Sequence, residues 1–206
     1  MRNIQENPSM RFDIRPATPD DAPVIAGYIN MSGQGVPLYS WKKAAGRTGD
    51  PLQIGADRVR REVGNLSYRN VKVAQADGSV AGMVLAYSTP NAGHNDLNGV
   101  PDYLRPFVRL EGKAAQSYYI NALAVAPEFR RKGIASRLLH MAEQDAIALG
   151  AQRATAIVFA ENQAARALFK DRGYEEQHTA PIAEHESHPY ERTKLILMVL
   201  ELPVQE

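Results

Sequence analysis

The chain has 206 residues, of which 44% are hydrophobic and 23% are charged, so it is long enough and apolar enough to bury one ordinary core. Its 24 basic and 23 acidic residues give a net charge of +1. Nucleic-acid-binding proteins usually carry a strong basic excess, so this balance argues against a nucleic-acid partner. Because the sequence has no cysteine, disulfides, zinc-thiolate sites and cysteine nucleophiles are excluded.

Residues 1–10 are expected to form an N-terminal tail. Residues 1–7 lack the apolar run of a signal peptide, and no stretch of about 18 apolar residues is present to cross a membrane. We therefore expect a soluble, cytoplasmic protein without a membrane partner.

The first elements predicted are a strand and two helices. Residues 11–15 alternate apolar and polar side chains, as a half-buried strand does. Thr18, followed by a proline and two aspartates, predicts the start of a helix, because a hydroxyl cap, an early proline and acids in the first turn all favour one. A second helix is expected within residues 54–63, where Gly55 weakens the pattern.

A hairpin and a long irregular connection are predicted next. Two alternating valines precede Asp77-Gly78, a pair typical of tight turns, and residues 80–87 continue as a buried strand. The periodic pattern then stops over residues 89–116, apart from a turn of helix around residues 103–110. We interpret residues 89–116 as a long insertion loop, because connections of this length are usually functional or disordered.

The second half of the chain returns to regular elements. They are expected in the order strand 118–125, helix 133–149, strand 154–160, a helix capped by Asn162 and ended by Gly173, and a buried strand at 195–200 preceded by one more strand. Strands and helices thus alternate along most of the sequence. This order predicts an α/β or α+β fold, in which a mixed sheet carries helices on both faces.

An anion site is predicted at the start of the longest helix. Arg130, Arg131 and Lys132 lie between a strand ending near Val125 and the helix that opens at Gly133. The first N–H groups of a helix lack internal partners and lie at the positive end of its dipole. A small residue there lets a phosphate approach the main chain, and the cations add charge-assisted contacts. A pyrophosphate would suit this arrangement.

Other interpretations of this segment were weighed. A solvated basic cluster before an ordinary helix is the simplest alternative, and it would be preferred for an isolated glycine. A Walker-type nucleotide loop is excluded, because no Gly-Lys-Ser/Thr follows a glycine at the required spacing. A Rossmann fingerprint fails because Gly133 lacks the accompanying glycines.

Two motifs make the pattern specific. The run Arg130-x-x-Gly133-x-Ala135 resembles the signature (Gln/Arg)-x-x-Gly-x-(Gly/Ala) of the GNAT acyltransferase superfamily, and it follows a strand that ends in Leu-Ala-Val-x-Pro. Further along, residues 162–174 resemble the second motif of that family, Asn-x-x-Ala-x-x-Leu-Phe-x-x-x-Gly-Tyr. The close resemblance covers residues 118–176.

The resemblance implies one acyltransferase domain over residues 11–203, with a six- to seven-stranded, mostly antiparallel sheet whose fourth and fifth strands splay apart. It also implies an N-acetyltransferase that uses acetyl-CoA and no metal. The acetyl group would pass to a primary amine of a small molecule or peptide by direct attack in a ternary complex.

Carried over by position, the resemblance assigns residues to acetyl-CoA. They are the backbone of Leu123, Ala124 and Val125 for the pantetheine arm and thioester carbonyl; Arg130, Arg131, Lys132, Gly133, Ile134, Ala135 and Ser136 for the pyrophosphate; and Asn162, Ala165 and Phe169 on the following helix. Asn162 would bond the pantetheine with its side chain. Its structural alternative is that it only caps its helix.

The sequence departs from the family pattern at the catalytic positions. Relatives often carry a tyrosine, which protonates the departing thiolate, where this chain has Phe169. Some relatives place a glutamate or histidine base where this chain has Asn121 and Tyr119. We expect these two residues to face the acceptor or to hold a water that relays the proton. Strand alternation places Tyr118 and Tyr119 on opposite faces, so only one can face the cleft.

The general base is sought in two segments that the family fold places near the acceptor. Residues 89–116 carry Asp96, Asp102 and Glu111, and residues 179–193 carry Glu184, His185, Glu186 and His188. Glu111 and His185 are the candidate bases, although charged loop residues are more often simply solvated. The sequence has no HExxH motif, so we expect no metal site. Tyr39 and Trp41, near the first helices, could line the acceptor pocket, although core packing is the preferred interpretation.

Two further functions and an assembly were considered. A former transferase that only senses acyl-CoA would explain Phe169 and the missing base. A nucleotide binder would explain the cations at 130–132 but not Asn162. The apolar final strands favour a homodimer that covers them.

Overall fold

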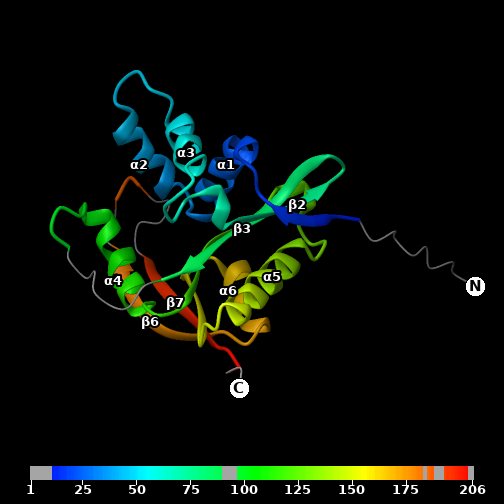
Figure 1. Ribbon diagram of the computed structural model, residues 1–206. Helices are drawn as coiled ribbons and strands as arrows, with labels where there is room; N and C mark the ends of the chain where they lie inside the picture. The colour runs from blue at the N-terminus through cyan, green and yellow to red at the C-terminus, as the bar shows by residue number, and fades with distance from the viewer. Residues whose placement is uncertain (1–10, 90–96, 183–184, 188–192, 204–206) are drawn as a thin grey trace, which may run out of the picture.

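The computed structural model describes residues 11–89, 97–182, 185–187 and 193–203, and within them one seven-stranded sheet forms the centre of the molecule (Figure 1). Its order is β1-β2-β3-β4-β5-β7-β6. The strands are β1 (Asp13–Pro16), β2 (Val71–Ala76), β3 (Ser79–Ser88), β4 (Tyr118–Val125), β5 (Arg153–Phe159), β6 (Glu175–Ile182) and β7 (Thr193–Glu201). Among the strands that the structure describes, only β4 and β5 pair in parallel, which confirms the predicted mixed, mostly antiparallel sheet.

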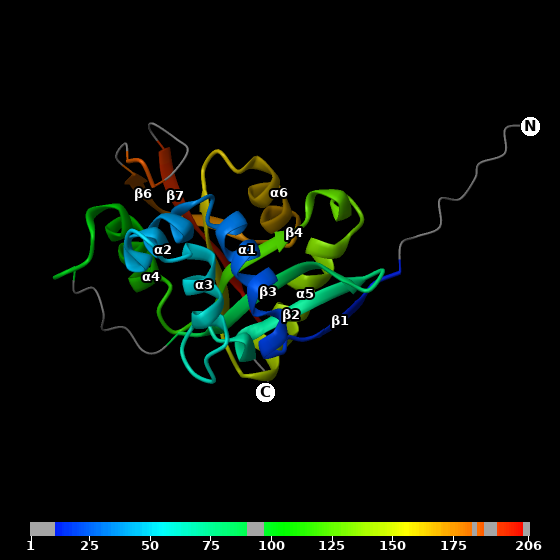
Figure 2. The same ribbon diagram turned by 90° about the horizontal axis from the view of Figure 1, so that it is seen from above.

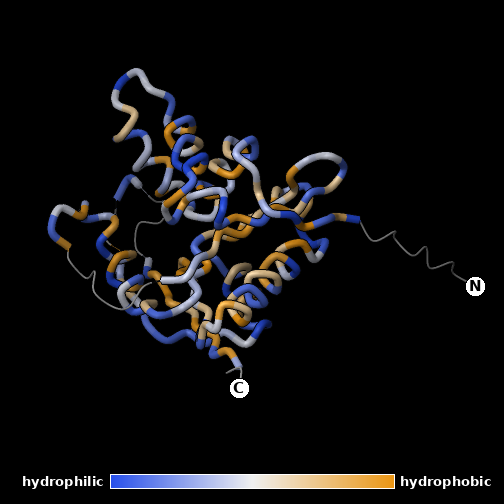
Figure 3. Tube along the Cα trace, viewed as in Figure 1, coloured by the Kyte–Doolittle hydropathy of each residue, from blue (hydrophilic) through white to orange (hydrophobic). Residues whose placement is uncertain are grey.

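Helices cover both faces of the sheet, as predicted. They are α1 (Ala22–Ser32), α2 (Val36–Ala45), α3 (Pro51–Val59), α4 (Arg105–Lys113), α5 (Ile134–Ala148) and α6 (Gln163–Asp171). Helices α5 and α6 pack on one face, and α1, α2, α3 and α4 lie on the other (Figures 1 and 2). Hydrophobic stretches of the chain gather where these layers meet (Figure 3).

Local turn chemistry fixes the connections that the sequence predicted. Asp77 and Gly78 both have positive φ, 50° and 76°, as the two central residues of a tight hairpin require. The long helix α5 lies between Gly133 and Gly150, both left-handed, with φ of 79° and 71°. Asn162 caps α6, because its Oδ1 accepts from the Ala165 amide at 3.1 Å.

Two elements were not located from the sequence. Helix α2 is short and begins next to Pro37, and it is held in place by burial of Val36 and Trp41 rather than by a clear periodic pattern. The first five residues of β6, Glu175–Thr179, are exposed, so they show no apolar alternation. Strand β6 also corrects the predicted 179–193 segment, because Thr179–Ile182 pair with β7.

The edges of the sheet bear on the predicted homodimer. The apolar β7 lies between β5 and β6, and β6 is the edge strand with mostly exposed polar residues. The exposed apolar edge on which the dimer was predicted is therefore not found among the described strands.

The sheet opens between β4 and β5, which confirms the predicted splay. Pairing is confined to Tyr118, Tyr119 and Ile120, which face residues 154–156 of β5. Beyond them the two strands have no register with each other, although β5 continues to pair with β7. A β-bulge lies at the same place, because Ile120 pairs with Ala86 and Ala122 with Leu85, so that Asn121 is the extra residue.

Candidate functional site

The loop after β4 runs directly into the N-terminus of α5. Arg131 and Gly133 are both left-handed, with φ of 62° and 79°. Left-handed residues in such a turn direct main-chain N–H groups toward a common anion. The first bond of the helix runs from the Arg137 amide to the Gly133 carbonyl, so the amides of residues 134–136 precede it. A Cβ on Gly133 would meet nothing within 4 Å, which leaves the space above the main chain open.

The three cations of this loop are exposed and differ in their contacts. Arg130 Nε donates to the Val125 carbonyl at 3.2 Å, and its Nη2 lies 3.6 Å from Met31 Sδ, so this side chain ties the loop to β4 and α1. Lys132 Nζ lies 5.4 Å from the centre of the Phe129 ring. Arg131 is exposed on the same turn. The structure therefore gathers Arg130 to Ser136 at one helix start, as an anion site requires.

Helix α6 holds the residues of the second motif. Asn162 caps the helix with its oxygen, and Ala165 is half-buried one turn further on. Phe169 is only 4% exposed and packs edge-to-face on Tyr174, with ring centroids 5.0 Å apart. Burial raises the pKa of Tyr174, whose hydroxyl is enclosed in the core. Phe169 is thus a packing residue of the core under α5 and α6.

The backbone of Leu123 to Val125 lines the splayed part of β4. There the Leu123 amide donates to Ser32 Oγ at 3.2 Å, a contact that links β4 to the last residue of α1. Ser32 was not predicted as a site residue. No local pattern indicates it, because the contact joins residues 91 positions apart.

Three of the four predicted catalytic residues lie together on the face opposite α5. Asn121 Nδ2 donates to the Tyr87 hydroxyl at 3.3 Å, and the rings of Tyr87 and Tyr119 meet edge-to-face at 5.8 Å. Burial, and then the nearby charge of Glu111, raise the pKa of both tyrosines. Both therefore stay protonated near neutral pH. Tyr118 faces the α5 side instead.

Glu111 from α4 is the ionisable carboxyl of this group. Its side chain keeps contact with solvent, yet the surrounding protein removes enough water to raise its pKa by desolvation. A solvent-reachable carboxyl with a raised pKa is suited to accept a proton. Tyr87 completes the group and was missed, because it lies in a strand that reads as core.

The fourth predicted residue, His185, belongs to an aromatic group with Tyr39 and Tyr103. Its ring stacks on Tyr103 at 5.0 Å and meets Tyr39 edge-to-face at 5.2 Å. Its Nδ1 lies 2.8 Å from Ser187 Oγ. The predicted residues Asp96, Glu184 and His188 lie outside the described residues, and Asp102 forms an exposed ion pair with Arg105 at 3.0 Å.

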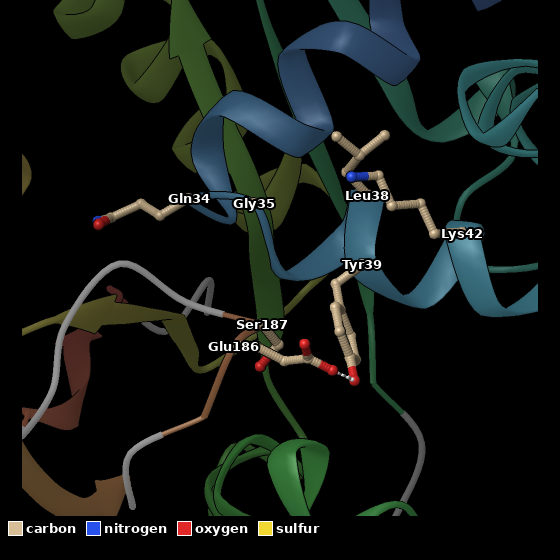
Figure 4. A pocket seen from close by; sticks show the side chains of 7 residues that line it. All are labelled: Gln34, Gly35, Leu38, Tyr39, Lys42, Glu186 and Ser187. Atoms are coloured by element: carbon tan, nitrogen blue, oxygen red, sulfur yellow. Dashed lines mark hydrogen bonds between the residues drawn. The ribbon is translucent and has the colours of Figure 1, made fainter.

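A pocket of about 250 Å³ opens beside this aromatic group, where the turn between α1 and α2 faces the connection between β6 and β7 (Figure 4). Its lining residues are Gln34, Gly35, Leu38, Tyr39, Lys42, Glu186 and Ser187. The Tyr39 hydroxyl donates to Glu186 Oε1 at 2.5 Å across it. Tyr39 therefore lines the pocket while its ring also packs against Tyr103 of the adjoining core cluster, and Trp41 is a core residue at 2% exposure.

The described part of the chain has neither a cluster of metal-ligating side chains nor a membrane-spanning helix. Within residues 11–89, 97–182, 185–187 and 193–203, no group of three or more His, Cys, Asp or Glu side chains is placed to hold a metal ion. In the same part of the chain, no helix has the length and apolar character needed to cross a membrane.

Comparisons with known proteins agree with this geometry. Solved structures with the same fold include an acetyltransferase (21% identity, 93% of this chain and 100% of that chain, TM-score 0.64). They also include the polyamine N-acetyltransferase of Drosophila melanogaster (15% identity, 93% of this chain and 100% of that chain, TM-score 0.65). A third is a ribosomal-protein-alanine N-acetyltransferase of Brucella melitensis (22% identity, 92% of this chain and 99% of that chain, TM-score 0.58). No curated protein sequence matches the chain.

The family comparison is more specific than these shared folds. The model of the acetyltransferase (GNAT) family matches residues 42–174, which is more than half of the chain and includes both motifs. The chain therefore belongs to the acetyltransferase (GNAT) family.

Proposed function

We propose that this protein transfers an acetyl group from acetyl-CoA to a primary amine by direct attack in a ternary complex. The observation that carries the proposal is the opening of the sheet after Ile120, which leads straight into the turn and free amides at the start of α5. Members of the GNAT family generally use acetyl-CoA. As the donor substrate it supplies a reactive thioester, an extended amide-bearing arm and an anionic pyrophosphate.

The residues present suit each part of that donor. The unpaired edge of β4 from Leu123 to Val125 offers main-chain groups to the amide-bearing arm, as a neighbouring strand would. Main-chain amides from Arg131 to Ser136, with the exposed cations around them, suit the pyrophosphate. On the adjacent helix, the half-buried Asn162 and Ala165 remain accessible to the donor, with Asn162 also serving as the cap, whereas Phe169 supports the helix from the core.

The acceptor amine must lose a proton before or during attack. We propose that the Glu111 carboxylate accepts this proton as the general base. Tyr119 and Asn121 lie in the same group, where they orient the amine or a water between it and the carboxylate. Since Phe169 has no proton to give, the thiol leaves as a thiolate. A free thiol has a pKa near 8.5, so this departure is tolerable unaided.

The pocket beside Tyr39 and Glu186 is proposed to receive the rest of the acceptor. Its lining mixes a carboxylate, a phenol hydroxyl, a lysine and the apolar Leu38. A small molecule or peptide that carries an amine could make both polar and apolar contacts there.

A binding-only role is the second candidate, and it is favoured by Phe169, which has no proton to donate, and by the absence of a carboxylate or histidine at Tyr119 and Asn121 of β4. One series of experiments separates the two. The melting temperature is measured with acetyl-CoA and, as a control, with ATP. At ~100 times its dissociation constant, a ligand stabilises by about 2.7 kcal/mol, which gives a visible shift.

An amine panel is then tested for release of free thiol. A shift with acetyl-CoA and turnover on any amine support the transferase. A shift without turnover across the panel supports the binding-only role, and no shift at millimolar acetyl-CoA contradicts both.

A further inference from the structure

One main-chain donor in the splayed part of β4 is bound by a side chain from another layer. The Leu123 amide donates to Ser32 Oγ at 3.2 Å. Leu123 is paired in register with Val84 of β3, but its N–H goes to Ser32, so it points away from β3 toward the opened side of the strand. The hydroxyl therefore fills the position in front of this amide that another acceptor oxygen would need.

The hydroxyl has a second capacity that this contact does not use. A serine hydroxyl accepts through its oxygen and also donates its own proton. Here Ser32 Oγ acts as the acceptor. Within the described part of the chain, the Ser32 hydroxyl donates its proton to no other group, and Ser32 lies in a half-buried position at the end of α1.

The surroundings of Ser32 connect it to both halves of the candidate site. Its neighbour Met31 contacts Arg130, which in turn bonds the Val125 carbonyl. On the other side, Gln34 and Gly35 line the pocket beside Tyr39. Ser32 thus lies where a donor held along β4 would meet an acceptor held in that pocket.

We propose that Ser32 is a catalytic residue that supplies a side-chain hydrogen bond to the acyl carbonyl oxygen. This inference rests on the proposed function. When the acyl donor occupies β4, its carbonyl oxygen takes the Leu123 amide, and the Ser32 hydroxyl moves off that amide and donates its proton to the same oxygen. Two donors then face the atom on which negative charge develops.

In the transfer step, the acyl group passes from sulfur to nitrogen through a tetrahedral intermediate. The amine nitrogen forms a bond to the acyl carbon while the carbonyl electron pair shifts to oxygen, where Ser32 and Leu123 stabilise it. The pair returns as the carbon–sulfur bond breaks, and sulfur keeps the electrons of that bond. The proton lost by nitrogen passes to Glu111. Ser32 itself forms no covalent bond.

The test compares Ser32→Ala and Ser32→Thr with the wild-type chain, and Ser79→Ala serves as a control at an exposed turn far along β3. Binding of acetyl-CoA and of CoA is measured by calorimetry, and turnover by release of free thiol. CoA lacks the acyl oxygen, so the ratio of the two dissociation constants isolates the contact with that oxygen.

In Ser32→Ala, binding of acetyl-CoA should weaken about 5-fold relative to CoA, and kcat should fall about 10²-fold. Ser32→Thr keeps the hydroxyl and should restore both quantities, while Ser79→Ala should match the wild type. Ser32→Ala with wild-type kcat and undiminished relative binding would overturn the proposal, because Ser32 would then only occupy the amide. An equal loss in the Ala and Thr variants would also overturn it.

If the proposed function itself is wrong, the same measurements give a different result. In that case the wild-type chain itself binds no acetyl-CoA and releases no thiol, and the Ser32 proposal falls with it. An active wild type with an active Ser32→Ala variant rejects only the role of Ser32.

Discussion

Asn121 Nδ2 donates to the Tyr87 hydroxyl at 3.3 Å, so the extra residue of the β4 bulge reaches back to the neighbouring strand β3. The bulge changes the alternation of β4, because Ile120 packs toward α5 whereas Ala122 packs on the opposite face. The contact holds Asn121 in the group that includes Glu111, on the side where the acceptor is proposed to bind.

Glu111→Gln should lower kcat by about 10²-fold or more, the usual contribution of a general base. Desolvation raises the pKa of Glu111, so the wild-type kcat/KM should fall as the pH drops through a value above the ordinary glutamate pKa of 4.5. The variant should lose this acidic limb, since glutamine does not titrate. The measurement is a pH profile at saturating acetyl-CoA, with Glu201→Gln at the exposed end of β7 as the control. Unchanged turnover in Glu111→Gln would remove Glu111 as the base.

The two glycines at the ends of α5 offer a matched pair of variants. Both have positive φ, and a Cβ at either would meet nothing within 4 Å, so Gly133→Ala and Gly150→Ala should each destabilise the fold by about 1–2 kcal/mol through backbone strain alone. Only Gly133 lies at the proposed pyrophosphate site. Calorimetry should therefore show weaker acetyl-CoA binding in Gly133→Ala and unchanged binding in Gly150→Ala. Equal affinities would contradict the placement of the pyrophosphate.

Tyr39→Phe should raise the KM for the acceptor about 5-fold or more and leave acetyl-CoA binding unchanged, because it removes the hydroxyl that donates to Glu186. Tyr68→Phe is the matched control, since the Tyr68 hydroxyl donates to Glu62 at 2.8 Å in an exposed pair outside the pocket. Steady-state kinetics on the first amine that the panel identifies measure both. An unchanged acceptor KM in Tyr39→Phe would exclude this pocket as the acceptor site.

Asp21→Asn should lower the free energy of unfolding by about 1–2 kcal/mol at pH 7. Two hydrogen bonds from Arg15, at 2.8 and 2.9 Å, hold the pKa of Asp21 at about 2 against an ordinary 3.8. A carboxyl group whose pKa is lowered in the folded state stabilises the fold at pH values above its ordinary pKa. This contribution is lost as the pH falls from 3.8 through 2.

The difference between wild type and Asp21→Asn should therefore shrink toward pH 2. Urea unfolding across this range measures it. Asp57→Asn breaks an exposed pair with Arg60 and should change stability by less than ~1 kcal/mol throughout. A difference that stays constant down to pH 2 would argue against the assigned pKa.

The elements that the sequence predicted well are those with local signals. The strand predicted at residues 118–125 has the same first and last residues as β4, because both ends of β4 coincide with changes in apolar content. The helix starting after Gly133 and the cap at Asn162 follow from short-range chemistry. The cofactor residues stay a prediction, which two spaced motifs that resemble one family support.

The parts that were missed depend on contacts between distant residues. The bulge at Asn121 is a matter of register between β3 and β4, and nothing in either strand alone specifies it. Ser32 gains its position only when α1 packs over the sheet. Glu111 was proposed from its place in the fold, and only the structure brings its charge close enough to Tyr87 and Tyr119 to raise the pKa of both.

The narrow junction between β4 and β5 has a mechanical consequence. Three residue pairs, with a hydrogen bond between the buried hydroxyls of Ser117 and Thr155 at 2.7 Å, join a four-stranded half of the sheet to a three-stranded half. A bound pantetheine arm would span the two halves as a temporary eighth strand. Beyond Ile120 the two halves would then be bridged only while the donor is held, so each release of CoA would reopen this gap.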